Sequence, residues 1–164
     1  MTILSDNDIA TKMTLGQLAI EPFNERNLQP ASIDLTLSDY LTLRNGHPVL
    51  PDAVIGGWML LPKQFVLGVT REHIMLDEWH CAELTGKSTI GRMGLAIHIT
   101  AGHVDPGFRG FLTLEICNLS NEGVIVKPGD PVCQLIFHEL SSRSTGYRGR
   151  YQNQGPHPEP ARKL

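Results

Sequence analysis

The residues with the clearest chemical potential lie between Gly86 and Asn118. These 33 residues combine a Lys-Ser-Thr group, an arginine, the aspartate of an Asp-Pro-Gly turn and a strand carboxylate: Lys87, Ser88, Thr89, Arg92, Asp105 and Glu115. Ammonium, guanidinium and hydroxyl groups bind anions, and a carboxylate can transfer protons. The combination predicts a site for a small phosphorylated substrate whose uncharged end undergoes chemistry.

Glu115 is the sharpest candidate for proton transfer. It stands between Leu114 and Ile116 in an alternating segment, and no Lys or Arg lies beside it in the sequence. One interpretation is an outward, solvated strand residue, which is common for glutamate. The other is a carboxylate that faces a pocket, where loss of water would raise its pKa and let it shuttle protons near neutral pH. The residue pattern leaves both interpretations open.

Arg92 and Asp105 also have two interpretations each. Arg92 is either a surface charge or a guanidinium fork that fixes substrate and stabilises charge in the reaction. Asp105 precedes Pro106 and Gly107, and turn chemistry alone accounts for it.

Two familiar site types are excluded by their missing residues. Gly86-Lys87-Ser88 imitates the end of a phosphate-binding P-loop, but Cys81 stands where that motif needs glycine, and the segment that follows alternates as a strand instead of opening a long helix. The His-x-Glu and Pro-Cys-x-x-Cys motifs of zinc deaminases are absent, and the seven histidines are dispersed. We therefore expect no zinc and no metal held by side chains, whereas Mg2+ can arrive with phosphates because it needs few protein ligands.

The elements that must position these residues are mostly strands. Alternation with period two predicts strands over residues 64–70, 94–101 and 111–117. In the last of these it places Leu112, Leu114 and Ile116 on one face and Glu115 on the other. Ser5 and Asp8 resemble a capping box at the start of a short first helix. Frequent Gly and Pro turns between short strands indicate an all-β sandwich or jelly roll with a few short helices.

The bulk composition fits one globular domain of 164 residues, with 41% hydrophobic and 19% charged residues. A net charge of -3 argues against non-specific nucleic-acid binding. No apolar run is long enough for a membrane span and no signal peptide is evident, so we expect a cytoplasmic location. The three scattered cysteines are expected to be reduced thiols.

The chain changes character near residue 141. We expect residues 1–140 to form the β domain and residues 141–164 a polar tail rich in Gly and Pro. A disordered tail is one interpretation. The other is a segment that closes over a nucleotide, because Tyr147, Arg148, Arg150, Tyr151 and Gln154 are unusual in an inert linker.

Five blocks, in this order, resemble the dCTP deaminase family of the trimeric dUTPase-like superfamily. The resemblance covers nearly the whole chain, and these blocks are its markers: QPASIDLTL (29–37), KSTIGRMGL (87–95), HITAGHVDPGFRGFLTLEICN (98–118), KPGDPVCQLIF (127–137) and YRGRYQNQ (147–154). The resemblance implies a distorted β-barrel or jelly-roll subunit in a homotrimer, with active sites between subunits. It also implies metal-free activation of water, with Mg2+ bound through the triphosphate of dCTP.

Carried over by position, the resemblance gives Glu115 the role of general base. It would activate water for attack on C4 of cytosine, then pass protons to N3 and to the leaving ammonia. Arg92 and Ser88 would position the base-proximal part of the substrate and support Glu115. Backbone groups around Thr100 and Ala101 would hold the pyrimidine and the water.

The remaining implied contacts involve the sugar and the phosphates. Asp105 would lie beside the deoxyribose and Gln134 near the sugar or base. The implied phosphate contacts are Lys87, Ser88 and Thr89, with Tyr147, Arg150 and Gln154 closing the tail over the triphosphate.

Several positions depart from the family's pattern or refine it. Lys87 stands where Arg is usual and loses the bidentate fork. Thr36 stands where Arg is frequent, and His103 where Arg or an apolar residue is common. Gly102 resembles members that also cleave dUTP to dUMP and pyrophosphate. Two alternatives stay open: a dUTPase without deaminase activity and a non-catalytic nucleotide-binding trimer.

Overall fold

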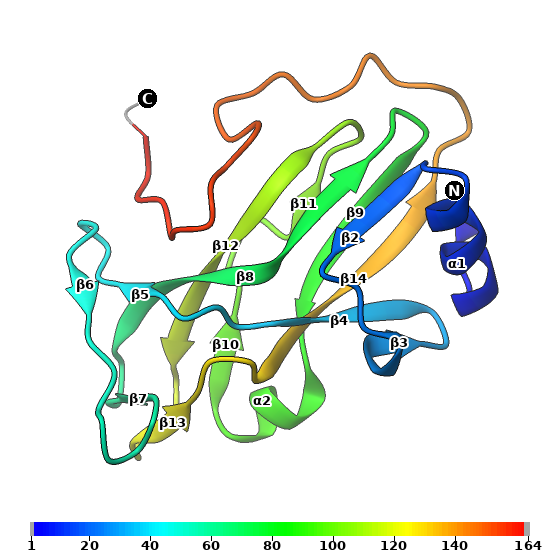
Figure 1. Ribbon diagram of the computed structural model, residues 1–164. Coiled ribbons are helices and arrows are strands. Elements are labelled where there is room, and N and C mark those ends of the chain that lie inside the picture. Colours follow the sequence, from blue (N-terminus) through cyan, green and yellow to red (C-terminus); the bar gives the residue numbers. More distant parts are fainter. Residues whose placement is uncertain (1, 163–164) are drawn as a thin grey trace.

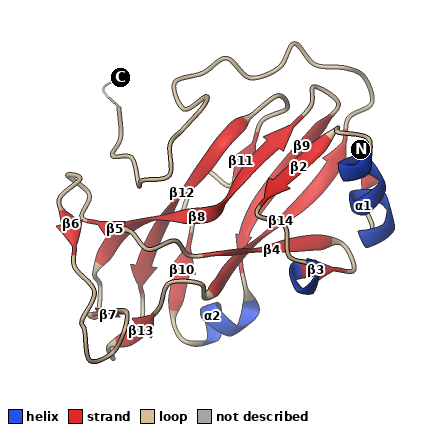
Figure 2. Cartoon of the chain, viewed as in Figure 1, coloured by secondary structure: helices blue, strands red, loops and turns tan. Residues whose placement is uncertain are grey.

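Two antiparallel β-sheets dominate the computed structural model, which describes residues 2–162 (Figures 1 and 2). The first sheet has the order β11-β9-β14-β4-β3, with β1 paired to β14. Its strands are β1 (Thr2–Ile3), β3 (Leu28–Gln29), β4 (Ser32–Thr36), β9 (His80–Gly86), β11 (His103–Val104) and β14 (Pro131–Glu139).

The second sheet has the order β10-β12-β8-β5-β6, with β2 paired to β8. Its strands are β2 (Leu18–Glu21), β5 (Leu41–Thr42), β6 (Pro48–Val49), β8 (Phe65–Leu76), β10 (Leu95–Ile97) and β12 (Arg109–Asn118). The other elements are the strand pair β7 (Trp58–Leu60) and β13 (Val124–Val126) and the helices α1 (Asp6–Thr14), η1 (Glu25–Asn27) and α2 (Ser88–Arg92). The predicted mainly β fold with a few short helices is confirmed. Within residues 2–162, no helix has the length and apolar character needed to cross a membrane.

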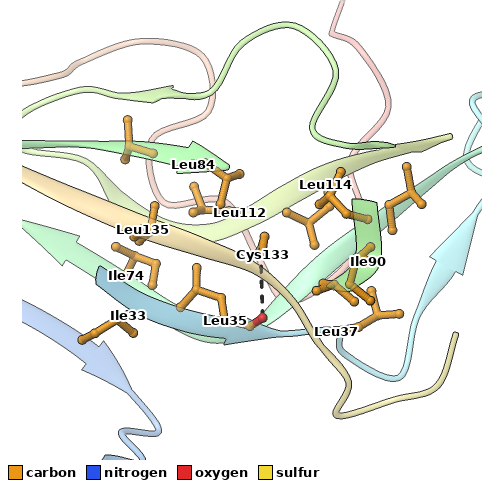
Figure 3. Packing of buried hydrophobic residues seen from close by; sticks show 14 of the residues in the cluster. Ile33, Leu35, Leu37, Ile74, Leu84, Ile90, Leu112, Leu114, Cys133 and Leu135 are labelled. Carbon is orange, nitrogen blue, oxygen red and sulfur yellow. Dashed lines mark hydrogen bonds between the residues drawn. The ribbon is translucent and has the colours of Figure 1, made fainter. Parts of the chain in front are cut away.

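The core lies where the two sheets face each other (Figure 3). Leu112, Leu114 and Ile116 of β12 point into it and are buried, as the alternation predicts. They pack in one cluster with residues of β4 and β14 such as Leu35 and Leu135. Burial of each such side chain stabilises the folded state by about 1.5–3 kcal/mol. The buried face of β12 therefore fixes the orientation of its opposite face, which carries Glu115.

The predicted first helix is confirmed, but the predicted strand over residues 94–101 is too long. Ser5 and Asp8 form the expected capping box of α1. Strand β10 ends at Ile97 because His98 takes a left-handed backbone conformation with φ 61°, and Ile99, expected on the buried face, is exposed. In addition, the residues directly after Lys87 form the five-residue helix α2.

The tail lies beside the first residues of β12 (Figure 1). Asn153 donates to the Arg109 carbonyl at 2.8 Å, and Phe111 donates to the Gln154 carbonyl at 3.0 Å. Gly110 permits this approach, because a Cβ there would come within 2.7 Å of the Gln154 backbone nitrogen. Its φ of 144° also suits glycine.

Glu72 of β8 is a buried carboxylate bound by Thr36 of β4. Thr36 donates its backbone N–H to Oε2 at 2.9 Å and its hydroxyl to Oε1 at 2.7 Å. Burial raises the pKa of Glu72 above its ordinary value, and the hydrogen bonds from Thr36 offset part of that rise.

We expect the Glu72→Gln variant to gain stability over the parent as pH rises. The native state holds the Glu72 proton more tightly than the unfolded chain does, so this group's contribution to stability is complete below its ordinary pKa and is lost as pH rises through the raised value. The neutral amide does not titrate. The Tm of the variant relative to the parent should therefore increase by a few degrees between about pH 4 and about pH 8.

The control is Glu21→Gln, which changes an exposed carboxylate at the end of β2. Its Tm difference from the parent should be the same at both pH values. A Glu72→Gln variant whose relative Tm falls as pH rises would contradict the assignment of Glu72 as a group with a raised pKa.

Candidate active site

A cavity of about 450 Å³ lies between β12, the segment before it and the tail. Its walls are largely apolar, with side chains from four strands and the loop that leads into β12: Phe65, Leu67, Leu84, Val104, Phe108 and Leu112. Asp105, Glu115 and Glu159 add carboxylates, and Arg44 adds a guanidinium group from the turn between β5 and β6. A concave, mostly apolar site with a few polar groups is typical of small-molecule binding.

Glu115 lines this cavity from the half-buried face of β12. Its Oε2 accepts a hydrogen bond from the Thr100 hydroxyl at 3.2 Å. Its backbone carbonyl accepts the N–H of His98 at 2.8 Å, which ties the loop after β10 to β12. Among the residues that the structure describes, no Lys or Arg forms an ion pair with Glu115.

The loop of residues 98–102 forms the cavity rim beside Glu115. The His98 ring, through Nε2, hydrogen-bonds the Ala101 carbonyl at 2.9 Å and so braces the loop. Leu84 of β9 donates to the Gly102 carbonyl at 2.7 Å. A Cβ at Gly102 would meet the Leu84 carbonyl oxygen at 2.6 Å, so this close approach itself requires glycine.

Asp105 lies at the rim with His103, and both side chains line the cavity. The His103 Nε2 atom is 3.6 Å from Asp105 Oδ1, and about half of each side chain is exposed. The backbone carbonyl of Asp105 accepts the Phe108 N–H at 3.2 Å, which closes the predicted turn.

The tail supplies the opposite wall. Tyr147 and Gln154 line the cavity, and Tyr147 packs on Phe108 with ring centroids 6.0 Å apart. Tyr151 lines it too, and its ring carries the Arg162 guanidinium 5.3 Å from its centroid. Two of the three tail residues predicted to meet substrate thus lie at the same cavity as Glu115.

Helix α2 and its neighbours lie outside this cavity. Lys87 forms an ion pair with the buried Asp34 of β4. Ser88, Thr89 and Arg92 are exposed. Gln134 of β14 contacts hydroxyl groups in its own sheet: it accepts from Ser32 at 3.3 Å and donates to Thr85 at 3.3 Å.

A family model described as dCTP deaminase-like matches residues 3–140. The chain belongs to the dCTP deaminase-like family. Its similarity extends over almost the whole chain to "dCTP deaminase, dUMP-forming" proteins. The one from Bifidobacterium longum (strain DJO10A) is 38% identical, covering 95% of this chain and 92% of the relative. The one from Coprothermobacter proteolyticus is 40% identical, covering 94% and 93%.

Solved structures confirm the dUTPase-like fold. A 2'-deoxycytidine 5'-triphosphate deaminase from Agrobacterium tumefaciens aligns with a TM-score of 0.71 at 22% identity, covering 84% of this chain. The alignment spans only 48% of the Agrobacterium chain. A dUTPase described as EIAV aligns with a TM-score of 0.55 at 19% identity, covering 82% of this chain and 98% of that one.

In this dCTP deaminase-like chain, the residues predicted for the site fall into two groups. Those that line the cavity are Ala101, Asp105, Glu115, Tyr147 and Gln154, and Thr100 reaches it through its bond to Glu115. Those that do not line it are Lys87, Ser88, Thr89, Arg92, Gln134 and Arg150. Ser88, Thr89 and Arg92 lie on α2, Lys87 lies directly before it, and Gln134 lies on β14.

Sequence reasoning missed several cavity residues. Thr113 lies two residues before Glu115, and period-two alternation was sufficient to place both on one face. Arg44 and Glu159 had no such signal, because the hairpin turn and the end of the tail reach the cavity only through the tertiary fold.

Proposed function

We propose that this protein converts dCTP and two molecules of water into dUMP, pyrophosphate and ammonia. The observation that carries the proposal is the carboxylate of Glu115, which lines a largely apolar cavity and is held by Thr100. The dUMP-forming relatives, at 38% and 40% identity, support both steps.

In the deamination step, Glu115 acts on a water molecule beside C4 of cytosine. It takes one proton as the water oxygen bonds to C4, and it passes that proton to N3. The second proton of the water then moves through Glu115 to the exocyclic nitrogen, the C4–N4 bond breaks, and ammonia leaves. The hydrogen bond from Thr100 fixes one carboxylate oxygen, which leaves the other free for this transfer.

The rim loop and the apolar walls position the pyrimidine. Backbone groups near Thr100 and Ala101 offer donors and acceptors at the edge of the ring. The apolar side chains exclude water that does not react, which strengthens the polar contacts that remain. Asp105 contacts the deoxyribose and, in the second step, helps to orient the water that attacks the α-phosphate.

Mg2+ would be held by the triphosphate oxygens and by water, because it needs few protein ligands. Among residues 2–162, no three His, Cys, Asp or Glu side chains are grouped to hold a metal. The Asp105 carboxylate at the cavity rim is an oxygen donor of the kind that Mg2+ accepts. When bound, Mg2+ would neutralise charge on the phosphates.

Part of each substrate site comes from a neighbouring copy in a homotrimer. The cavity has three carboxylates and one arginine, which is a poor environment for a polyanion. The exposed Ser88, Thr89 and Arg92 of α2 are free to enter a second subunit's cavity. In this arrangement Arg92 and Ser88 support the Glu115 of another copy.

Chromatography of the nucleotides after incubation with dCTP and Mg2+ tests the function. We expect dUMP to accumulate with ammonia and pyrophosphate in equal amounts. A dUTP peak as the end product would limit the activity to deamination. Conversion of dUTP with dCTP left intact would identify a dUTPase, and tight dCTP binding without product would identify a non-catalytic protein.

A further inference from the structure

One hydroxyl group anchors the tail at two separate points. The Thr113 Oγ1 atom accepts a hydrogen bond from the Gln154 side-chain amide and another from the Glu159 backbone N–H, the latter at 3.1 Å. A threonine hydroxyl has two acceptor lone pairs, so these two donors use its full acceptor capacity. The first contact spans 41 positions of the sequence and the second spans 46.

The segment held in this way is a wall of the cavity. Gln154, Glu159 and Ala161 all line it. Pro158, between the two anchor points, is buried, and Gln154 is only 6% exposed. This part of the tail therefore packs as an ordered wall, and it meets the body of the protein at the Thr113 hydroxyl.

Thr113 also shares a strand face with the proposed catalytic group. It lies two residues before Glu115 on the same face of β12, and both side chains line the cavity. Strand side chains two residues apart are neighbours on the same face. The tail is therefore anchored to the side chain next to Glu115 on this face of β12.

We infer that Thr113 is a positioning residue: its hydroxyl holds residues 154–159 against the cavity, so that the tail can orient the nucleotide at Glu115. This inference rests on the proposed function for its consequence in catalysis. The anchoring itself is a property of the free protein and is measurable without turnover.

The test compares Thr113→Val, which keeps the shape but removes both acceptor sites, with Thr113→Ser, which keeps the oxygen. Thr42→Val of β5 is the matched control, because it removes a strand hydroxyl that has no hydrogen bond to the tail. Hydrogen–deuterium exchange of the amides of residues 153–155, 157 and 159 is measured in the full-length protein without nucleotide. Thr113→Val should speed this exchange by about tenfold or more, whereas the Ser variant and the control should match the parent.

Steady-state kinetics with dCTP and Mg2+ give the second readout. Thr113→Val should raise KM by about tenfold with a smaller effect on kcat, and Thr113→Ser should restore the parental KM. Parental exchange in Thr113→Val would overturn the inference, as would faster exchange with an unchanged KM. If the parent does not convert dCTP, the proposed function fails separately, and the exchange data still decide whether Thr113 anchors the tail.

Discussion

The Glu115→Gln variant will release ammonia from dCTP at least about 10³-fold more slowly than the parent, because general acid–base groups contribute roughly 10²–10⁴-fold and here one group performs every proton transfer. Glutamine has the size of glutamate and keeps an oxygen that can accept the Thr100 hydroxyl, so the cavity should retain its shape. It cannot take a proton from water. The loss should therefore appear in kcat, with dCTP affinity within a few-fold of the parent by calorimetry.

The control for this experiment is Glu122→Gln, which changes an exposed carboxylate just beyond β12. It should keep parental kcat and KM. A Glu115→Gln variant with full ammonia release would rule out Glu115 as the general base, whatever the fold or the binding affinity.

Two inactive variants will restore activity when their subunits are mixed. Arg92→Ala should lower kcat by about 10²–10³-fold, as loss of one charge-stabilising donor commonly does. If each site takes Glu115 from one copy and Arg92 from another, trimers reassembled from equal amounts of Glu115→Gln and Arg92→Ala chains contain some intact sites. Random assembly makes about a quarter of the sites intact, so about a quarter of the parental activity should return.

The matched control mixes Glu115→Gln with a chain that carries both substitutions, which creates no intact site. This mixture should stay inactive. Recovery in neither mixture, with each pure variant still folded as a trimer, would mean that Arg92 acts within its own subunit. That result would contradict the site between copies but not the role of Glu115.

The face of β12 that carries Glu115 was predictable from the sequence because its signal is local. Leu112 and Leu114 are buried as the alternation predicts, and this alone places Glu115 on the opposite face. At residues 94–101 the local alternation does not match the structure. The alternation continues past Ile97, but His98 turns the chain with a positive φ that nothing in its neighbourhood indicates.

Local sequence patterns do not predict contacts between segments that are distant in the sequence. The pairing of Lys87 with Asp34 joins positions 53 residues apart. The docking of the tail depends on Gly110 and Thr113, which local composition cannot connect to a polar C-terminal segment. Local patterns therefore could not predict that residues 153–159 pack against β12.

The resemblance to the dCTP deaminase family found the cavity residues that local patterns did not. Ala101 carries no individual signal, and Tyr147 and Gln154 stand out only as unusual residues in a polar tail, yet each lines the cavity with Glu115. The positions on α2 remained unexplained within a single subunit, because Arg92 and Ser88 are exposed outside the cavity.

A crystal structure of the Glu115→Gln variant with dCTP and Mg2+ is the most direct test of the proposed chemistry. We expect the cytosine ring inside the cavity, with the residue 115 amide within hydrogen-bond distance of N3 or of a water beside C4. We also expect Ser88 and Thr89 of another subunit at the triphosphate, and Arg92 of that subunit beside residue 115. A cytosine ring bound elsewhere, with residue 115 facing bulk water, would contradict the proposed chemistry.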